Sequence, residues 1–268
     1  MLSIIIPTYN ERENMEPLLK RLDAVRSNLQ DPMEILVVDG GSQDGTVACA
    51  QHYLADRSLG RVIAISDRPS LVAAVGEGIR QARGEVIGVM DADLSHPPEL
   101  LPTLIRAVRA GAQVAVASRY VPGGGVANWP WSRRLLSCAG NLLARPLVPV
   151  ADARSGYFVC RAELVKQRPL EVHGFKVLLQ LLVQRRVQEV NEVPYLFTPT
   201  PGRHGRQPVE EWRGDPQGIR GSHGRQSVVW GFTDRIRSTS KLGSRTLWCY
   251  LRQVARLYYD RWLRPQVS

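Results

Sequence analysis

Two acidic clusters, each at the end of an apolar run, are the residues of this chain best suited to chemistry. Asp39 closes the first run, and Asp91 and Asp93, separated by Ala92, close the second. Magnesium and manganese ions prefer oxygen ligands and are commonly held by one or two carboxylates together with phosphate oxygens. Apolar runs of this kind are typical of buried parallel strands, and open α/β sheets bind ligands beyond the carboxyl ends of such strands. The sequence therefore predicts one crevice that holds a nucleotide and a divalent metal ion.

Each acidic cluster also has an ordinary structural explanation. An aspartate between a strand and a helix can cap the helix without any metal, and Gly40 with Gly41 can form a plain tight turn. In the functional interpretation, these glycines let a ligand approach the backbone, and Asp39 accepts hydrogen bonds from a base or a ribose. His96 and the two prolines after it open a helix directly behind Asp93, which favours the functional interpretation.

Alternating strand-like and helix-like patterns in the first half of the chain must position these clusters. Strands are predicted at residues 2–7, 34–39, 61–66, 86–91 and 113–118. Residues 14–29 carry apolar side chains at three- and four-residue spacings, which predicts an amphipathic helix, and another helix is predicted from 97 to 111. Repeated strand and helix units predict an α/β fold with a mainly parallel central sheet.

The second half of the chain is less regular. Helices are predicted at 132–144 and 175–184, and strands at 156–160 and 188–196. From 198 to 231 the chain is rich in Gly, Pro, Arg and Gln, a composition that cannot bury enough apolar surface to fold alone. A flexible surface insertion and an RNA-binding arm both fit this segment. We therefore expect a main domain at 1–197, an insertion at 198–231 and a C-terminal segment at 232–268.

A basic amphipathic helix is predicted near the C-terminus. Its apolar stripe recurs at spacings of three and four residues and consists of Leu247, Leu251, Val254, Tyr258 and Trp262. Arginines stand beside this stripe, and a basic helix with aromatic residues on its apolar side can lie in a membrane interface. The same stripe can equally pack on the main domain, so both interpretations stay open.

Charge and composition restrict the class of protein. The formal net charge of +10 indicates a partner such as nucleic acid, anionic lipid or a phosphorylated ligand. The four cysteines stand far apart, which favours a reducing cytosol and offers no zinc ligand set. The N-terminal apolar run is too short for a signal peptide, and no uncharged apolar run is long enough for a membrane helix. We therefore expect a cytoplasmic protein.

Several ordered motifs together resemble the family 2 glycosyltransferases, and within them the dolichyl- and polyprenyl-phosphate mannose synthases. The motifs are the segments 7–11, 37–46, 91–98, 118–120, 155–158 and 240–242. The resemblance covers nearly the whole chain outside 198–231. It implies a GT-A fold, a nucleotide-sugar donor and a lipid phosphate acceptor.

The resemblance also implies roles for individual residues. Around the donor nucleoside it places Pro7, Tyr9, Glu11, Val37 and Asp39. At the donor diphosphate and a Mg²⁺ or Mn²⁺ ion it places Asp91, Ala92 and Asp93, with Ser95 as a third metal ligand where related synthases often have Gln. At the phosphate of the acceptor it places Arg119, Lys176, Arg235 and Lys241. Asp91, Asp93 and Arg119 are the residues expected to be catalytic.

The implied reaction is the inverting transfer of mannose from GDP-mannose to a dolichyl or polyprenyl phosphate. The acceptor phosphate is the nucleophile, and its second pKa, near ~6, makes a general base unnecessary. The enzyme would work peripherally at the cytosolic face of a membrane, alone or with a membrane-embedded partner subunit. Transfer of another sugar, such as glucose from UDP-glucose, would use the same residues. An inactive transferase scaffold that binds nucleic acid or lipid is the alternative from a different class.

Three features depart from the family pattern. Gly40 stands where a second aspartate is usual, and Arg154 stands where a small or apolar residue commonly precedes the Ser-Gly segment. The insertion at 198–231 interrupts the path to the C-terminal arginine and lysine. Because closure entropy grows slowly with loop length, we expect this insertion to be tolerated, and a weakened enzyme is the other outcome.

Overall fold

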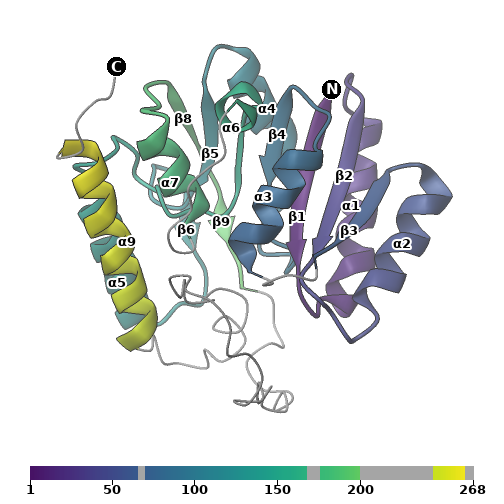
Figure 1. Cartoon of the computed structure of the whole chain (residues 1–268), viewed down its shortest axis with the longest axis horizontal. Coiled ribbons are helices and arrows are strands. Elements are labelled where there is room, and N and C mark those ends of the chain that lie inside the picture. The colour runs from purple at the N-terminus through teal and green to yellow at the C-terminus, as the bar shows by residue number, and fades with distance from the viewer. Residues whose placement is uncertain (66–69, 168–175, 200–243, 263–268) are drawn as a thin grey trace, which may run out of the picture.

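A seven-stranded sheet with the order β3-β2-β1-β4-β7-β5-β8 forms the centre of the protein (Figure 1). The computed structural model describes residues 1–65, 70–167, 176–199 and 244–262. The strands of the central sheet are β1 (Leu2–Thr8), β2 (Met33–Asp39), β3 (Gly60–Ala64), β4 (Val86–Val89), β5 (Val114–Ser118), β7 (Phe158–Arg161) and β8 (Val190–Pro194). A second, two-stranded sheet pairs β6 (Gly125–Val126) with β9 (Leu196–Phe197).

Within the described central sheet, β7 alone runs antiparallel to its neighbours. Phe158 at the start of β7 pairs with Val89 of β4 on one side and with Val116 of β5 on the other. The remaining pairs are parallel, which confirms the predicted mainly parallel sheet. Because β7 is reversed, its first residues lie at the same edge of the sheet as the carboxyl ends of β1, β2, β4 and β5.

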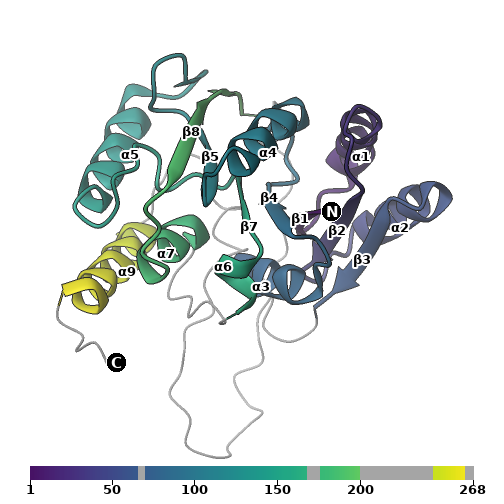
Figure 2. The ribbon, with the colours of Figure 1, turned by 90° about the horizontal axis from the view of Figure 1, so that it is seen from above.

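Helices cover both faces of the central sheet, as the edge-on view shows (Figure 2). One face packs against α1 (Arg12–Ser27), α2 (Thr46–Arg57) and α4 (Leu101–Arg109), and the other against α3 (Leu71–Gln81), α6 (Glu163–Lys166), α7 (Val177–Gln184) and α9 (Ser244–Trp262). In β1, Ile4 and Ile6 join the cluster of the first group, whereas Ile5 joins that of the second. Side chains alternate across a strand, so a run that is buried on both faces is apolar throughout.

The predicted boundaries hold within a few residues, with two informative differences. The helix predicted at 97–111 begins as a short 3-10 turn, η1 (Pro98–Leu100), before α4. The strand predicted at 188–196 divides into β8 and β9. Tyr195 causes the division, because its N–H donates to Ser118 of the central sheet at 3.1 Å while its carbonyl accepts from Gly125 of the small sheet at 3.0 Å. The chain therefore changes sheets at Tyr195.

The C-terminal helix α9 packs on α7 and on α5 (Trp131–Ala144). Gln253 Nε2 of α9 donates to Gln180 Oε1 of α7 at 3.0 Å, and the Tyr250 hydroxyl donates to the Gly140 carbonyl of α5 at 2.6 Å. The buried apolar residues of α9 are Tyr250, Val254 and Leu257. Packing on the main domain is thus confirmed for this helix.

The face of α9 that packs overlaps the predicted stripe only in part. Within that stripe Val254 is buried and Tyr258 partly buried, whereas Leu247, Leu251 and Trp262 are exposed. The helix carries apolar side chains both on its packed face and on its exposed face, and the predicted stripe includes residues of each. No described helix is both long enough and apolar enough to span a bilayer. Apart from 198 and 199, the insertion at 198–231 lies outside the described residues, as do Arg235 and Lys241.

Candidate active site

The carboxyl ends of β1, β2, β4 and β5 and the start of β7 bring the residues predicted for the donor, together with Arg119, to one edge of the sheet. Thr8 at the end of β1 pairs with Asp39 at the end of β2, and the Met90 N–H after β4 donates to Ile5 of β1 at 3.1 Å. A Cβ added to Gly156, just before β7, would lie 3.3 Å from Asp91 Oδ2. Segments far apart in sequence therefore meet beside Asp91.

Asp39 organises the loop that follows β2. Its Oδ2 accepts hydrogen bonds from the N–H groups of Gly41 at 2.9 Å and Ser42 at 2.8 Å, and its Oδ1 accepts from Ser42 Oγ at 2.5 Å. Gly41 has a φ of +91°, a conformation that glycine adopts without strain. The same loop is tied to the end of β1, because Ser42 Oγ accepts from the Asn10 N–H at 2.8 Å. The two strand ends therefore form one braced unit.

The other residues expected at the nucleoside surround this unit. Pro7 and Val37 lie within β1 and β2 and are buried, whereas Tyr9 is partly exposed beyond the end of β1. Glu11 is buried, its carboxylate accepts from Asn14 Nδ2 at 2.8 Å, and its N–H donates to Thr46 Oγ1 at 2.8 Å. The structure thus brings these residues together around the loop of Asp39, with Tyr9 as the most accessible side chain of the four.

The second acidic cluster is a tight turn after β4. Asp93 Oδ1 accepts both the N–H of Ser95 at 3.1 Å and its hydroxyl at 2.5 Å. Leu94 between them has a φ of +61°, so the turn places a bulky residue in the left-handed region. Ser95 is buried and Ala92 is buried, whereas Asp91 and Asp93 are partly exposed. The two carboxylates are therefore the accessible oxygens of this turn, and Ser95 fixes the direction of one of them.

His96 supports Asp91 from inside the protein. Its Nδ1 accepts the Asp91 N–H at 2.9 Å, so the neutral ring carries its proton on Nε2, which lies 3.9 Å from Asp91 Oδ2. The buried ring stacks on Tyr157 with centroids 5.1 Å apart, and the Tyr157 hydroxyl donates to the Pro97 carbonyl at 2.9 Å. Sequence reasoning used His96 only as a context for the acidic pair. Its contact with Tyr157, 61 positions further along the chain, became visible only in the fold.

The chemistry of this turn fits a hard divalent cation. Carboxylate oxygens of Asp91 and Asp93 are the donors that Mg²⁺ and Mn²⁺ prefer, and Gly156 leaves open the space beside Asp91 that a side chain would fill. Across the described residues, no three His, Cys, Asp or Glu side chains form a closed metal cluster. An ion held here would therefore take further ligands from a bound substrate, as Mg²⁺ commonly does with phosphates.

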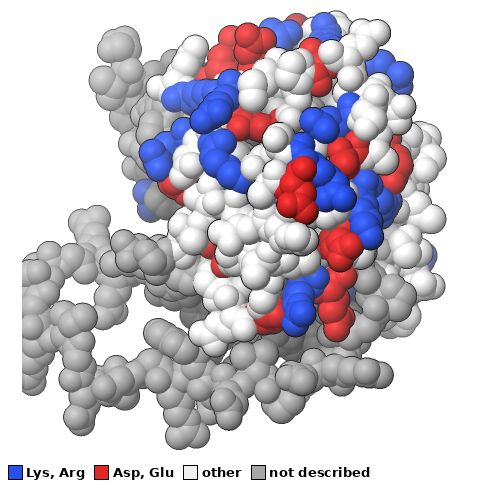
Figure 3. All heavy atoms as spheres, turned by 90° about the vertical axis from the view of Figure 1, so that its right-hand side faces the viewer, with Lys and Arg blue, Asp and Glu red and all other residues white. Residues whose placement is uncertain are grey.

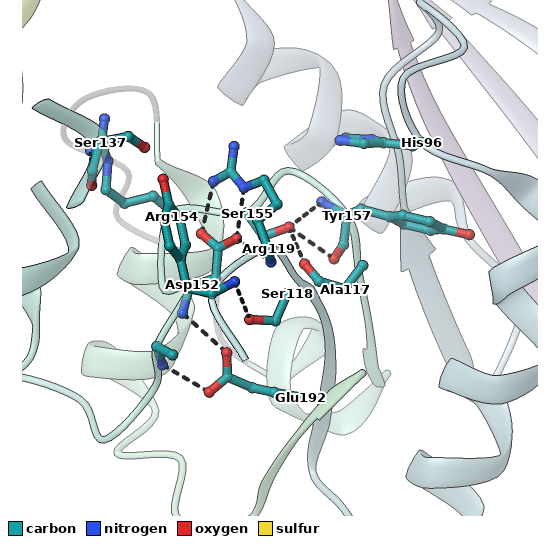
Figure 4. A network of polar contacts seen from close by, with 12 residues as sticks. His96, Ala117, Ser118, Arg119, Ser137, Asp152, Arg154, Ser155, Tyr157 and Glu192 are labelled. Carbon is teal, nitrogen blue, oxygen red and sulfur yellow. Dashed lines mark hydrogen bonds and ion pairs between the residues drawn. The ribbon is translucent and has the colours of Figure 1, made fainter. Parts of the chain in front are cut away.

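Arg119, directly after β5, is held in place by the carboxylate of Asp152 (Figure 4). Its Nε donates to Asp152 Oδ2 at 2.7 Å and its Nη2 to Asp152 Oδ1 at 2.8 Å, a bidentate pair that is almost wholly buried. Glu192 of β8 holds the Asp152 loop by accepting its N–H at 3.0 Å. Burial alone lowers the pKa of Arg119, but the ion pair outweighs burial and raises that pKa above its ordinary value. The arginine is permanently charged and fixed in direction.

A second arginine, Arg133 at the start of α5, shares an aromatic ring with Arg119. The guanidinium carbons of Arg133 and Arg119 lie 4.2 Å and 5.7 Å from the centroid of Trp129. Burial and the charge of Arg119 both lower the pKa of Arg133. Two cations beside a single carboxylate, Asp152, leave this half of the site positively charged and suited to an anion. The sequence analysis did not identify Arg133 or Asp152 as site residues. The feature that could have pointed to Arg133 is the aromatic residue shortly before the adjacent arginines 133 and 134.

The position of Tyr195 links the acidic and basic halves of the site. Burial raises the pKa of Tyr195, the positive charge of Arg119 lowers it, and the carboxylates of Asp152, Asp91 and Asp93 raise it further. The hydroxyl is therefore within electrostatic range of both halves. Lys176, expected near the acceptor phosphate, is the residue before α7, and its carbonyl accepts from Gln253 of α9 at 3.3 Å.

Arg154, one of the three departures, is buried beside α5 and α9. Its Nη1 donates to the Ser137 carbonyl at 3.3 Å, and its guanidinium carbon lies 4.5 Å from the ring centre of Tyr250. Its Nε has no hydrogen-bond partner, and burial lowers the pKa of the group. A Cβ on Gly140 would collide with this guanidinium, so the arginine occupies the space that glycine leaves. Arg154 therefore ties the C-terminal helix to the loop of Asp152.

Comparison with known proteins places the chain in a sequence family. The model of "Glycosyl transferase family 2" matches residues 3–179. The dolichol-phosphate mannosyltransferase of Pyrococcus furiosus is 38% identical over 259 residues, which are 95% of this chain and 63% of that protein. The polyprenol monophosphomannose synthase of Mycolicibacterium smegmatis is 40% identical over 206 residues, covering 73% of this chain and 76% of the relative. The chain thus spans less than two thirds of the Pyrococcus relative's length.

Solved structures agree on the architecture. Mannosyl-3-phosphoglycerate synthase from Rubrobacter xylanophilus superposes with a TM-score of 0.63 at 18% identity, covering 100% of this chain and 77% of that one. Glucosyl-3-phosphoglycerate synthase from Mycobacterium tuberculosis, solved with Mn²⁺ and UDP-glucose, gives 0.61 at 18% identity, with coverages of 100% and 80%. These likenesses confirm the expected glycosyltransferase fold of the GT-A type.

Proposed function

The chain belongs to glycosyl transferase family 2, and from this premise we propose that it transfers mannose from GDP-mannose to a dolichyl or polyprenyl phosphate. The names of the relatives from Pyrococcus furiosus and Mycolicibacterium smegmatis support the sugar and the lipid acceptor. The observation that carries the proposal is the division of the site into an acidic half and a basic half at one sheet edge. Such a division suits two phosphorylated substrates that approach from opposite sides.

The acidic half is the proposed donor site. Asp39 and its braced loop would hold the nucleoside, with Pro7, Tyr9, Glu11 and Val37 around it. Asp91 and Asp93 would hold a Mg²⁺ or Mn²⁺ ion, with Ser95 close to it and the backbone at Ala92 beside the diphosphate. When bound, the ion neutralises negative charge on the departing nucleoside diphosphate. Whether the ion is Mg²⁺ or Mn²⁺ is part of the proposal. The Mn²⁺ bound in the Mycobacterium tuberculosis structure supports a divalent ion.

The basic half is the proposed acceptor site. Arg119 donates two of its five guanidinium N–H groups to Asp152, which keeps the guanidinium oriented. Its other N–H groups can contact a phosphate. Arg133 shares the Trp129 ring with Arg119 and would supply a second cation. Lys176, Arg235 and Lys241 complete the proposed set. Two guanidinium groups on a rigid scaffold recognise phosphate oxygens with defined geometry.

The proposed chemistry is a single displacement. A phosphate oxygen of the acceptor forms a bond to the anomeric carbon of mannose, while the bond from that carbon to the donor diphosphate breaks and its electron pair leaves with GDP. The configuration at the anomeric carbon is inverted. The second pKa of a phosphate monoester lies near ~6, so the nucleophile is largely dianionic at neutral pH and needs no general base. The cations at 119 and 133 would hold this dianion in line with the carbon.

Membrane contact and domain organisation are part of the same proposal. We expect the enzyme to work peripherally at the cytosolic face, where a polyprenyl phosphate presents its head group. The residues 1–197 would form the catalytic domain, 198–231 an insertion, and 232–268 the segment that carries Arg235, Lys241 and α9. A membrane-embedded partner subunit is compatible with this arrangement.

Transfer of radiolabelled mannose from GDP-mannose to a short polyprenyl phosphate in detergent tests the proposal. We expect a labelled lipid that forms with Mg²⁺ or Mn²⁺ and is abolished by a chelator and by Asp93→Asn. UDP-glucose in parallel decides the donor, because turnover with it alone would keep the reaction type and replace the sugar. Failure with both donors, with RNA or lipid binding retained, would favour the non-catalytic scaffold.

A further inference from the structure

Tyr195 is the residue at which the chain crosses from the central sheet to the small sheet, and its main chain is held on both sides. Its N–H donates to the Ser118 carbonyl at 3.1 Å, and its carbonyl accepts from the Gly125 N–H at 3.0 Å. Ser118 is the residue before Arg119, so the first of these bonds fixes Tyr195 beside the basic half of the site. The backbone at this crossing is therefore constrained before any ligand binds.

The ring of Tyr195 is held by aromatic neighbours from both halves of the site. It makes edge-to-face contacts with the rings of His96 and Phe197, whose centroids lie 6.2 Å and 6.5 Å away. His96 accepts the N–H of Asp91, and the Phe197 ring lies 5.7 Å from the guanidinium carbon of Arg119. The side chain of Tyr195 therefore stands at the junction of the acidic half and the basic half.

The hydroxyl of this buried residue has no hydrogen-bond partner. Tyr195 is only 5% exposed, and among the described residues no group donates to its oxygen or accepts from it. The buried neighbour Tyr157 shows the usual arrangement, since its hydroxyl donates to the Pro97 carbonyl at 2.9 Å. The fully enclosed unpaired side-chain atoms of the described residues include Trp129 Nε1 but not the Tyr195 oxygen, so this oxygen faces a space that solvent can reach. It is therefore available to a ligand.

The charges that act on this hydroxyl come from both halves of the site. Burial has the largest effect and raises the pKa of Tyr195, the charge of Arg119 lowers it, and the carboxylates of Asp152, Asp91 and Asp93 raise it. The result is a pKa above the ordinary value for tyrosine, so the hydroxyl stays protonated and uncharged at neutral pH. Such a group can donate one hydrogen bond and accept others, which suits an uncharged polar ligand.

A single displacement places the transferred sugar between the two halves of the site. This step rests on the proposed function, in which the donor diphosphate lies at Asp91 and Asp93 and the acceptor phosphate at Arg119. Both phosphate groups then have charged partners, on opposite sides of the anomeric carbon. The hydroxyl groups of the sugar are uncharged and need partners at the junction, which is where the unpaired hydroxyl of Tyr195 stands.

We propose that the Tyr195 hydroxyl forms a hydrogen bond with a hydroxyl group of the transferred hexose. Because the main chain and the ring of Tyr195 are both held in place, the contact orders no flexible group when the sugar binds. A site that hydrogen-bonds a substrate hydroxyl discriminates strongly against an analogue that lacks it. Tyr195 is thus a substrate-contacting residue that contributes to the choice of sugar.

Donor analogues that each lack one sugar hydroxyl test this contact. Tyr195→Phe removes the oxygen alone and keeps the ring contacts with His96 and Phe197. For wild type and variant, kcat/KM is measured with GDP-mannose and with each deoxy analogue, and titration calorimetry with Mn²⁺ compares the binding of GDP-mannose with that of GDP. The matched control is Tyr53→Phe on α2, where the tyrosine is 7% exposed. It lies at the end of the molecule where Lys and Arg are mixed with Asp and Glu on the surface (Figure 3).

We expect Tyr195→Phe to lower kcat/KM for GDP-mannose about tenfold, to weaken the binding of GDP-mannose by a similar factor and to leave the affinity for GDP unchanged. With one deoxy analogue the two proteins should be equal, because that analogue has already lost the contact. Thermal unfolding of the variant should show no loss of stability, since the removed hydroxyl has no partner in the protein. A variant that behaves like Tyr53→Phe, that weakens GDP binding, or that loses the same factor with every analogue would overturn the proposal.

This inference and the proposed function fail in distinguishable ways. If no sugar reaches a polyprenyl phosphate, but GDP-mannose binds more weakly to Tyr195→Phe than to the wild type while GDP binds equally, the proposed reaction fails and the sugar contact stands. If the wild type transfers mannose and Tyr195→Phe does so unchanged, the sugar contact fails alone. If UDP-glucose is the only donor used, the same comparison with UDP, UDP-glucose and its deoxy analogues decides the contact by the same outcomes.

Discussion

The Arg119 guanidinium and the Asp152 carboxylate form a bidentate pair with both hydrogen bonds between 2.7 and 2.8 Å. Asp152 also accepts the Arg119 backbone N–H at 3.0 Å, so one carboxylate fixes both the side chain and the main chain of the arginine. The aspartate itself is fully buried. This relationship makes the basic half of the site rigid before any ligand binds, which lowers the entropy that binding would otherwise cost.

Asp152→Asn should destabilise the protein and impair the acceptor site. The change leaves the buried charge of Arg119 without its counter-charge, which costs about 3–5 kcal/mol of the free energy of unfolding. Urea unfolding measures this loss, and the KM for polyprenyl phosphate should rise in the same variant. The control is Glu163→Gln, because the pair of Glu163 with Arg161 is exposed and should contribute less than about 1 kcal/mol. Equal effects of the two variants would contradict the role given to Asp152.

Arg154→Met should leave the free energy of unfolding within about 1 kcal/mol of the wild type. The substitution removes a buried guanidinium whose Nε has no hydrogen-bond partner, and this gain offsets the lost contact with the Tyr250 ring. Replacing buried charge by an apolar side chain of similar volume is often neutral. Urea unfolding decides the question. A loss as large as that expected for Asp152→Asn would mean that the hydrogen bond to the Ser137 carbonyl and the contact with the Tyr250 ring outweigh the cost of burying the guanidinium.

Ser95→Ala should weaken the binding of a divalent metal more than it slows the reaction at saturating metal. The backbone N–H and the hydroxyl of Ser95 both donate to Asp93 Oδ1, and the substitution removes the hydroxyl bond that helps to orient this proposed metal ligand. Loss of such an orienting partner typically costs about 10–100-fold in metal affinity or activity. Titration of activity with Mn²⁺ separates the two effects, and Asp93→Asn should be inactive at every metal concentration. Unchanged metal dependence in Ser95→Ala would remove Ser95 from the site.

Gly156→Ala should reduce activity with little change in stability. The added Cβ would lie 3.3 Å from both Asp91 Oδ2 and His96 Cε1, so it would enter the space beside the carboxylate and displace it. Activity should fall by about tenfold or more, in line with the cost of moving a reacting group by a fraction of an ångström. Thermal unfolding and transferase assays on the same preparation provide the comparison. Wild-type activity would show that Asp91 can move without consequence.

Glu34→Gln should destabilise the protein at neutral pH and have less effect in acid. Burial by itself raises the pKa of Glu34, but hydrogen bonds from Ser3, Arg83 and Arg61 outweigh burial and hold the pKa below its ordinary value of 4.5. The stabilisation from this carboxylate is therefore fully present above pH 4.5 and is lost as the pH falls through the lowered pKa in the folded protein. The difference in unfolding free energy between variant and wild type, measured from pH 7 downwards, should shrink below pH 4.5. A difference that does not depend on pH would contradict this.

The fold of the first half was predictable because its signals are local. Continuous apolar runs predict strands such as β1 and β2. They also indicate that both faces of the sheet are buried, since alternate side chains point to opposite faces. The reversal of β7 was not predictable, because so short an apolar run gives no direction to a strand. Yet this reversal is what brings Gly156 to Asp91 and Tyr157 to His96.

The packing face of α9 shows a related limit. Spacing alone identified an apolar stripe on this helix, but the helix has apolar residues on two faces, and only the contacts with α5 and α7 decide which face is inside. The stripe chosen from the sequence was for the most part the outer one.

The sequence by itself determined the α/β alternation, the two acidic strand ends and the resemblance to family 2 glycosyltransferases. Each of these depends only on the order of neighbouring residues along the chain. The tertiary structure decided which distant groups complete the site. Asp152 reaches Arg119 across 33 residues, and Tyr157 reaches Pro97 across 60. Such pairs depend on the order of strands in the sheet and on the reversal of β7, which are settled by packing free energy summed over the whole core. No local pattern of residues encodes that sum.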